Sequence, residues 1–147
     1  MKKKNLERPI YDNGGITYET YNDGKVTKAT LSGVALNFDN AMRRIFKDSK
    51  CLRFNHVFDK KKLTYTYQLP NTFTAKAKLN PVDEQNPEVG ENVAHDRVMD
   101  KYHRAFDANM REVVEDIHRT VARLYRYCEK KNINIKSCKS IEDFLKD

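Results

Sequence analysis

The residues of this chain that are best suited to chemistry are cations near its C-terminal end. Arg123, Arg126 and Lys130 have no acidic residue four positions before them, and their spacing places them along one stripe of a helix. Tyr125 and Tyr127 stand beside that stripe. Cations with neighbouring aromatic rings bind phosphates and stack on bases, although cations at a helix C-terminus also suit the helix dipole. The candidate residues for binding an anionic partner are Arg97, Lys101, Arg123, Tyr125, Arg126 and Lys130.

The net charge is consistent with such a partner. The chain of 147 residues has 28 Lys and Arg against 21 Asp and Glu, a formal net charge of +7. This excess favours nucleic acid, a nucleotide or an acidic protein surface as a partner. A lysine-rich surface that maintains solubility explains the same number equally well.

Sequence patterns of enzymes and metal sites are absent. The histidines form neither HxxxH nor HExxH, and the sequence contains no P-loop, GxGxxG motif or nucleophile elbow. Cys51, Cys128 and Cys138 include no close pair, which favours free thiols in a reducing compartment. The acidic residues near position 88 are better explained as partners of a helix dipole than as metal ligands. We therefore predict a non-enzymatic protein without a metal ion or cofactor.

The candidate cations lie on a predicted amphipathic helix over residues 87–131. Asn86 is a suitable cap and Pro87 a suitable first residue, and neither Pro nor Gly occurs after Gly90. The helix would be about 60 Å long at ~1.5 Å per residue, so we expect it to fold back near Asn109 or to lie against another subunit. Apolar residues at three- and four-residue steps predict an oligomer interface formed by Phe106, Met110, Val113, Ile117, Val121 and Leu124.

In the middle of this helix, most arginines are expected to form ion pairs with acidic residues of the same helix. Each of three acidic residues there precedes an arginine by four positions, a spacing that stabilises a helix by a few tenths of a kcal/mol per pair. The pairs are Asp100 with Arg104, Asp107 with Arg111, and Glu115 with Arg119. Binding capacity is therefore expected at the two ends of the helix.

The rest of the chain predicts an antiparallel sheet of about five strands in an α+β fold. The Asp-Gly pair at Asp23 predicts a hairpin over residues 16–31, and period-two alternation predicts a meander over residues 51–79. The small side chains of Ala75 and Ala77 would let the long helix approach one face of the sheet. We expect residues 1–15 to form a flexible lead-in segment. The whole chain, 1–147, is expected to be a single domain.

Two short helices are also predicted. One covers residues 39–47, with Asn37 or Asp39 as its cap and a buried face of Met42, Ile45 and Phe46. The other covers residues 141–146, where Ser140 begins a capping box.

One segment resembles a recurrent type of small phage-encoded accessory protein. The matching residues are Thr74-Ala75-Lys76-Ala77-Lys78-Leu79-Asn80-Pro81-Val82-Asp83-Glu84, then Gly90, then Ala94-His95-Asp96-Arg97. Proteins of that type have a strand ending in an Ala-Lys-x-x-Pro-x-Asp-Glu element, a Gly, an Ala-x-x-Arg helix start and a long charged helix. This chain has Leu79 where a cysteine is common and Gln85 where an aromatic residue is common. The resemblance implies a phage or prophage setting.

Small oligomeric proteins from that setting often act against host defence. The resemblance therefore implies a counter-defence inhibitor of the host cytoplasm, either anti-CRISPR-like against a host nuclease complex or sequestering a signalling nucleotide. The alternative is an accessory protein of phage replication or regulation that binds DNA or RNA directly. We expect a homo-oligomer without a membrane segment, since no apolar run approaches the roughly 18 residues that a bilayer crossing needs.

Overall fold

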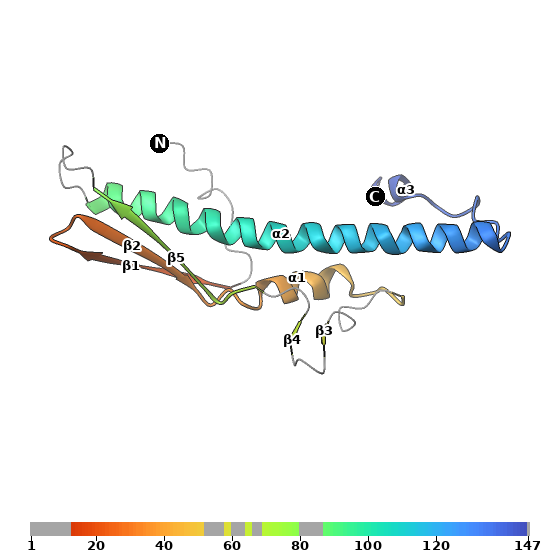
Figure 1. Cartoon of the computed structure of the whole chain (residues 1–147), viewed down its shortest axis with the longest axis horizontal. Coiled ribbons are helices and arrows are strands. Elements are labelled where there is room, and N and C mark those ends of the chain that lie inside the picture. Colours follow the sequence, from red (N-terminus) through yellow and green to blue (C-terminus); the bar gives the residue numbers. More distant parts are fainter. Residues whose placement is uncertain (1–12, 52–57, 60–63, 66–68, 80–86, 147) are drawn as a thin grey trace. The chain divides into compact units, whose positions relative to one another are not determined.

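The computed structural model describes residues 13–51, 58–59, 64–65, 69–79 and 87–146 (Figure 1). It confirms an α+β fold. The elements are β1 (Gly15–Tyr21), β2 (Val26–Ser32), α1 (Asn37–Ile45), β3 (Phe58–Asp59), β4 (Thr64–Tyr65), β5 (Thr72–Lys78), α2 (Pro87–Lys130) and α3 (Ile141–Leu145). The chain divides into two compact units, Met1–Asn109 and Met110–Asp147. Helix α2 belongs to both, and the division falls beside Asn109.

Strands β1 and β2 form the predicted hairpin. Asn22, Asp23 and Gly24 all have positive φ angles, of 55°, 55° and 81°. These residue types adopt that conformation at least cost, so the local sequence determines the turn. The N–H of Lys25 closes it by donating to the carbonyl of Asn22 over 3.0 Å.

The main sheet has three antiparallel strands in the order β1-β2-β5. Strand β5 pairs with β2, with Ala75 opposite Ala29, whereas β3 and β4 form a separate ladder in which Phe58 is opposite Tyr65. The predicted five-stranded sheet with a consecutive meander is therefore wrong for the described residues. The alternation of Phe73, Ala75 and Ala77 indicated a covered face but contained no information about which strand lies alongside. The rest of the predicted meander, at 52–57, 60–63 and 66–68, lies outside the described residues.

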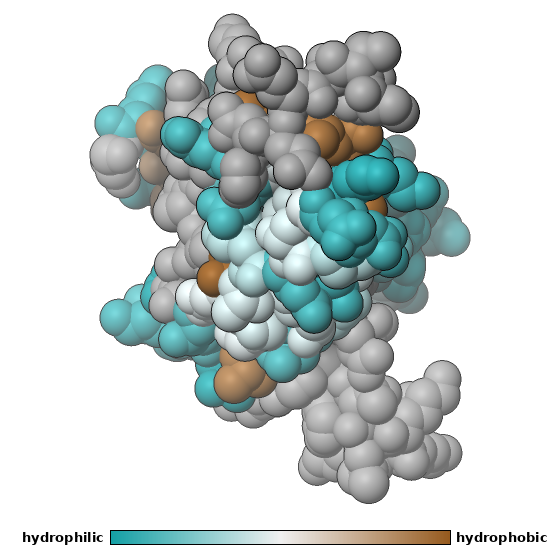
Figure 2. Space-filling model, turned by 90° about the vertical axis from the view of Figure 1, so that its left-hand side faces the viewer, coloured by the Kyte–Doolittle hydropathy of each residue, from teal (hydrophilic) through white to brown (hydrophobic). Residues whose placement is uncertain are grey.

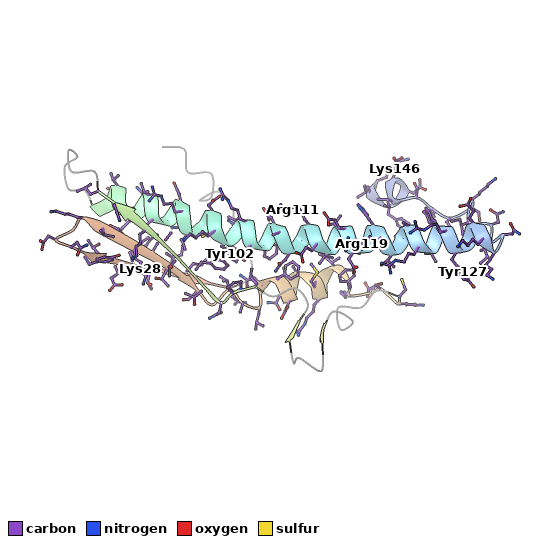
Figure 3. The ribbon with its side chains drawn as sticks, in the orientation of Figure 1. Lys28, Tyr102, Arg111, Arg119, Tyr127 and Lys146 are labelled. Atoms are coloured by element: carbon purple, nitrogen blue, oxygen red, sulfur yellow. The ribbon has the colours of Figure 1, made fainter. Side chains whose placement is uncertain are left out.

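The core of the first unit lies between this sheet and the first half of α2. Ala29 and Leu31 on β2 are fully buried, and so are Ala94 and Val98 on α2. Tyr102 points from α2 toward the strands (Figure 3), and its ring meets that of Phe73 edge to face, with centroids 5.7 Å apart. Ala75 and Ala77 are 5% and 6% exposed, which confirms that the long helix lies against them.

Gly90 allows the close approach of α2 to β2. A Cβ atom at this position would lie 2.6 Å from Oγ1 and 3.3 Å from Cβ of Thr27. Thr27 is itself 3% exposed and opposite Ala77 in the sheet register. Small residues on both sides therefore set the distance between helix and sheet.

Helix α1 differs from its prediction at both ends. It covers residues 37–45 instead of 39–47, and the preceding residue, Leu36, makes no side-chain capping bond. Neither Asn37 nor Asp39 is the cap, because both lie inside the first turn. Phe38 and Met42 are buried, whereas Ile45 is 56% exposed and Phe46 is half-buried. The predicted buried face was therefore wrong at Ile45, which is the last residue of the helix.

The end of α2 and the start of α3 lie close to the positions that the sequence predicted. Helix α2 stops where Asn132 adopts a φ of 55°, and the N–H of Ile133 donates to the carbonyl of Cys128 over 2.8 Å, as in a Schellman motif. Helix α3 begins at the predicted capping box, in which the N–H of Ser140 donates to Oδ2 of Asp143 over 2.9 Å. No helix in the described ranges has both the length and the apolar character for crossing a bilayer.

Candidate functional site

The second half of α2 leaves apolar side chains in solvent. Val114, Val121 and Leu124 are 44%, 38% and 56% exposed, and Ile117 is half-buried. We refer to these four residues as the apolar stripe. Three- and four-residue steps place them on one side of the helix. Large apolar side chains gathered on one side in this way are typical of an interaction surface.

Two residues of the predicted oligomer interface are used within the chain. Phe106 is 4% exposed and packs against Phe38 in the first unit, with ring centroids 5.4 Å apart. Val113 is 7% exposed, and Met110 is half-buried. The other three predicted residues, Ile117, Val121 and Leu124, belong to the apolar stripe, which also contains Val114.

Cations occupy the side of α2 opposite the apolar stripe. Arg123, Arg126 and Lys130 are all exposed, and we refer to them as the basic face. Arg119, one turn earlier, lies 3.9 Å from Glu115 and 3.8 Å from Asp116, so its charge is partly compensated. The ion pair predicted between Asp100 and Arg104 also forms, over 2.8 Å. The side chains of Arg119 and Tyr127 project outward from the helix (Figure 3).

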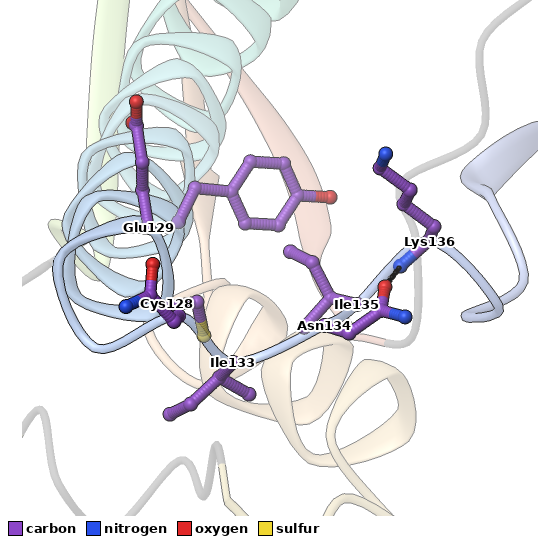
Figure 4. A pocket seen from close by; sticks show the side chains of 8 residues that line it. Cys128, Glu129, Ile133, Asn134, Ile135 and Lys136 are labelled. Carbon is purple, nitrogen blue, oxygen red and sulfur yellow. Dashed lines mark hydrogen bonds between the residues drawn. The ribbon is translucent and has the colours of Figure 1, made fainter.

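A shallow hollow follows the end of α2. It has a volume of about 470 Å³ and is lined by Tyr125, Cys128, Glu129, Asn132, Ile133, Asn134, Ile135 and Lys136. Figure 4 shows Cys128 and Ile133 together on one side, and the backbone N–H of Lys136 donating to Oδ1 of Asn134 over 3.0 Å. Tyr125 therefore borders this hollow.

Arg97 and Lys101 lie apart from the basic face, in the first unit. The Arg97 guanidinium donates to the carbonyl of Lys76, and the Lys101 ammonium donates to the carbonyl of Thr74, each over 2.7 Å. Both carbonyls belong to β5, which is one of the two edge strands of the three-stranded sheet. The two cations thus supply hydrogen-bond donors to carbonyls at an edge of the sheet that has no neighbouring strand among the described residues. A search for acidic partners four residues away could not have found these contacts, because the acceptors are backbone atoms of another element.

Tyr18 and His95 form a contact that the sequence did not indicate. The Tyr18 hydroxyl lies 2.7 Å from Nδ1 of His95, and the two rings are stacked with centroids 6.4 Å apart. Burial, followed by the negative charges of Glu91 and Asp96, raises the pKa of Tyr18. The hydroxyl therefore stays protonated at neutral pH and ties β1 to α2.

Potential metal-ligating side chains are scattered over the described part of the chain. No three His, Cys, Asp or Glu side chains there are grouped closely enough to hold a metal ion. The face shown in Figure 2 is mostly hydrophilic over its coloured atoms, with hydrophobic residues in small separate patches.

Fold and surface together define an α+β protein with a small sheet unit and a largely exposed amphipathic helix segment. Comparison with protein-family models, curated proteins and solved structures finds no match to this chain.

Proposed function

We propose that this chain is a non-enzymatic phage or prophage protein that counteracts host defence by binding a host nuclease complex. The observation that best supports this is the exposure of the second half of α2. That segment has the basic face on one side and the apolar stripe on the other. The phage setting comes from the sequence resemblance around residues 74–97.

The chemistry of the basic face suits such a target. A nuclease complex contains nucleic acid, whose phosphates carry negative charge. Exposed cations on a rigid helix speed the encounter with an acidic surface and orient it. Arg126 and Lys130 have the strongest claim to this role, because Arg123 lies nearer to the apolar stripe.

A plaque assay tests the proposal. A bacterium with an active nuclease-based defence is challenged with a phage that this defence restricts, with and without expression of the chain. Expression should raise plaquing efficiency by at least tenfold, and Arg126→Ala/Lys130→Ala should remove most of that gain. Lys47→Ala/Lys50→Ala is the matched control, because it removes two exposed charges from a different element. Unchanged plaquing with the wild-type chain, or full activity of Arg126→Ala/Lys130→Ala, contradicts the proposal.

Direct binding to nucleic acid is the second candidate. It is favoured by Tyr125 and Tyr127, which are 59% and 56% exposed beside the basic face and are available for base stacking. Such binding should weaken steeply between low and physiological salt, as counterion release requires. A mobility-shift titration with single- and double-stranded DNA and RNA decides the matter. Absence of any shift at low salt excludes this candidate.

A further inference from the structure

One face of the three-stranded sheet is turned away from α2. Thr27, Ala29 and Leu31 of β2 are buried on the side that packs against the helix. Successive side chains of a strand point to opposite faces, and Figure 3 shows Lys28 on the side away from α2. We refer to this side as the outer face. By the register of the strands, it contains Thr17, Glu19 and Tyr21 of β1, Val26, Lys28, Thr30 and Ser32 of β2, and Thr72, Thr74, Lys76 and Lys78 of β5.

The outer face is polar and has an excess of positive charge. Glu19 stands against three lysines, and Val26, the aliphatic residue among these described positions, is buried. Lys28 and Thr30 are half-buried, whereas the four residues of β5 are exposed. Ammonium and hydroxyl groups are therefore the main groups that this face presents to solvent.

Two of these lysines are directly opposite each other. Lys28 of β2 pairs with Lys76 of β5 in the register, on strands that run about 5 Å apart. Like charges in opposite positions destabilise a sheet. Lys78, two residues farther along β5, adds a third positive charge about 7 Å from Lys76. Departures of this kind from local preference are expected where a surface has a function.

Further positive charge is held beside the same strand. Arg97 and Lys101 both donate to backbone carbonyls of β5. The Lys76 ammonium lies over the ring of Tyr21, 5.7 Å from its centroid, which keeps it above the outer face. The summed charge at this edge of the sheet therefore favours an anionic partner.

The residue types distinguish between two classes of anionic partner. Protein–protein interfaces have an apolar core and are depleted of Lys and Ser, whereas the outer face has its aliphatic residue buried. Contacts with the phosphates and sugars of nucleic acids use Lys together with the hydroxyls of Ser, Thr and Tyr. The outer face thus fits a nucleic-acid backbone better than an acidic protein.

We propose that the outer face binds the phosphate backbone of a nucleic acid. Lys28, Lys76 and Lys78 contact phosphates, and the hydroxyls of Thr30 and Thr74 donate hydrogen bonds beside them. Contacts of this kind are made to the backbone, so they carry no sequence preference of their own. The proposal goes beyond the inhibition of a nuclease complex and does not depend on it. It also differs from the second candidate function, in which the basic face of α2 binds the nucleic acid.

Titration of the purified chain with a fluorescently labelled single-stranded oligonucleotide, at several salt concentrations, is the direct test. Lys28→Gln/Lys76→Gln/Lys78→Gln should raise the dissociation constant about tenfold or more. It should also reduce the slope of log affinity against log salt concentration by about 2, at ~0.7 per phosphate contact. A slope that is the same in this variant and in the wild-type chain overturns the proposal.

Two control variants locate the binding. Lys47→Gln/Lys50→Gln/Lys146→Gln removes the same total charge from exposed positions elsewhere and should leave the slope nearly unchanged. An equal loss of affinity in this control means that net charge alone drives binding, which overturns the proposal. The second control replaces the three cations of the basic face by glutamine. If that variant loses affinity while the outer-face variant keeps it, the second candidate function stands and this proposal fails.

Lys76→Glu separates binding from folding. It places opposite charges at the pair with Lys28, so the thermal unfolding midpoint should stay the same or rise. The affinity for the oligonucleotide should nevertheless fall about tenfold or more. A lower midpoint with unchanged affinity shows a purely structural role for Lys76 and contradicts the proposal.

An acidic polypeptide tests the competing class of partner. Polyglutamate with as many negative charges as the oligonucleotide should compete for the chain about tenfold less well, because it lacks phosphates and sugars for the hydroxyl contacts. Equal competition by polyglutamate overturns the proposal and indicates an acidic protein surface as the partner of the outer face.

Discussion

The side-chain amide of Asn37 donates a hydrogen bond to the hydroxyl of Tyr102 over 3.0 Å, between residues that are 1% and 0% exposed. The same amide donates to the carbonyl of Asn13 over 2.7 Å and accepts from its N–H over 3.1 Å. One side chain thus connects α1, α2 and the segment that leads into β1. Buried polar groups of this kind are costly to leave without partners.

Asn37→Ala is therefore expected to lower the free energy of unfolding by about 2–4 kcal/mol, because three polar groups lose their partner at once. Tyr102→Phe retains the ring and loses one hydrogen bond, so it should cost about 1 kcal/mol. Urea unfolding of both variants and of the double variant gives the coupling between the two residues. Costs that simply add would show that Asn37 and Tyr102 do not interact energetically.

Gly90→Ala should destabilise the first unit although alanine favours helix formation. The added Cβ would overlap Thr27, at an expected cost of about 1–3 kcal/mol, against a gain of about 1 kcal/mol in helix propensity. Gly90→Ala/Thr27→Ala should recover part of the loss. Gly15→Ala is the matched control, because no atom lies within 4 Å of a Cβ there. Thermal unfolding midpoints compare the variants, and a more stable Gly90→Ala chain would refute the close approach.

The buried carboxyl of Asp39 predicts a pH dependence of stability. Burial raises the pKa of Asp39 above its ordinary value of 3.8, and the nearby Arg43 opposes this by lowering it. The folded chain therefore binds more protons than the unfolded chain, so the contribution of Asp39 to stability falls as pH rises from 3.8 through the raised pKa.

Asp39→Asn removes this titration. The difference in free energy of unfolding, variant minus wild type, should increase with pH across that window and stay constant above it. Urea unfolding between about pH 3 and pH 8 measures the difference, with the exposed Asp48→Asn as a matched control. A difference that is flat with pH would show that Asp39 titrates alike in both states.

Arg97 and Lys101 are expected to stabilise the edge of β5. Arg97→Ala and Lys101→Ala should each lower the free energy of unfolding by about 0.5–1.5 kcal/mol, and together they should increase aggregation, because they expose strand carbonyls. Arg104→Ala is the control, since its ion pair with Asp100 is on the surface and worth less than about 1 kcal/mol. Unfolding curves and light scattering report the two effects. A loss of partner binding without any loss of stability would instead favour the sequence prediction that both residues bind an anion.

Elements determined by neighbouring residues could be predicted from the sequence. The turn at Asn22-Asp23-Gly24 and the capping box at Ser140 depend on backbone conformations that few residue types prefer. A few consecutive residues are therefore enough to predict them. The pairing of Ala29 with Ala75 joins residues far apart in the chain, and alternation alone does not identify the partner strand. The role of Asn37 could not be predicted from its neighbours either, because its side chain makes tertiary hydrogen bonds instead of capping α1.

The candidate site was predictable to a similar degree. Spacing identified the cations of the basic face and the apolar stripe, because both follow from helix geometry. It could not separate Phe106, which packs inside the chain, from Leu124, which is exposed, because both have the same periodicity. Burial depends on where α1 and the sheet end along α2.

The passage of α2 through both units has a consequence for folding order. Starting a helix is the unfavourable step, whereas each further residue adds to an existing turn at little cost. The half of α2 that packs on the sheet supplies the nucleus, and residues 110–130 are then added by propagation. The exposed segment therefore depends on the sheet unit for its helical order, and a peptide limited to residues 110–147 should be largely unstructured in water.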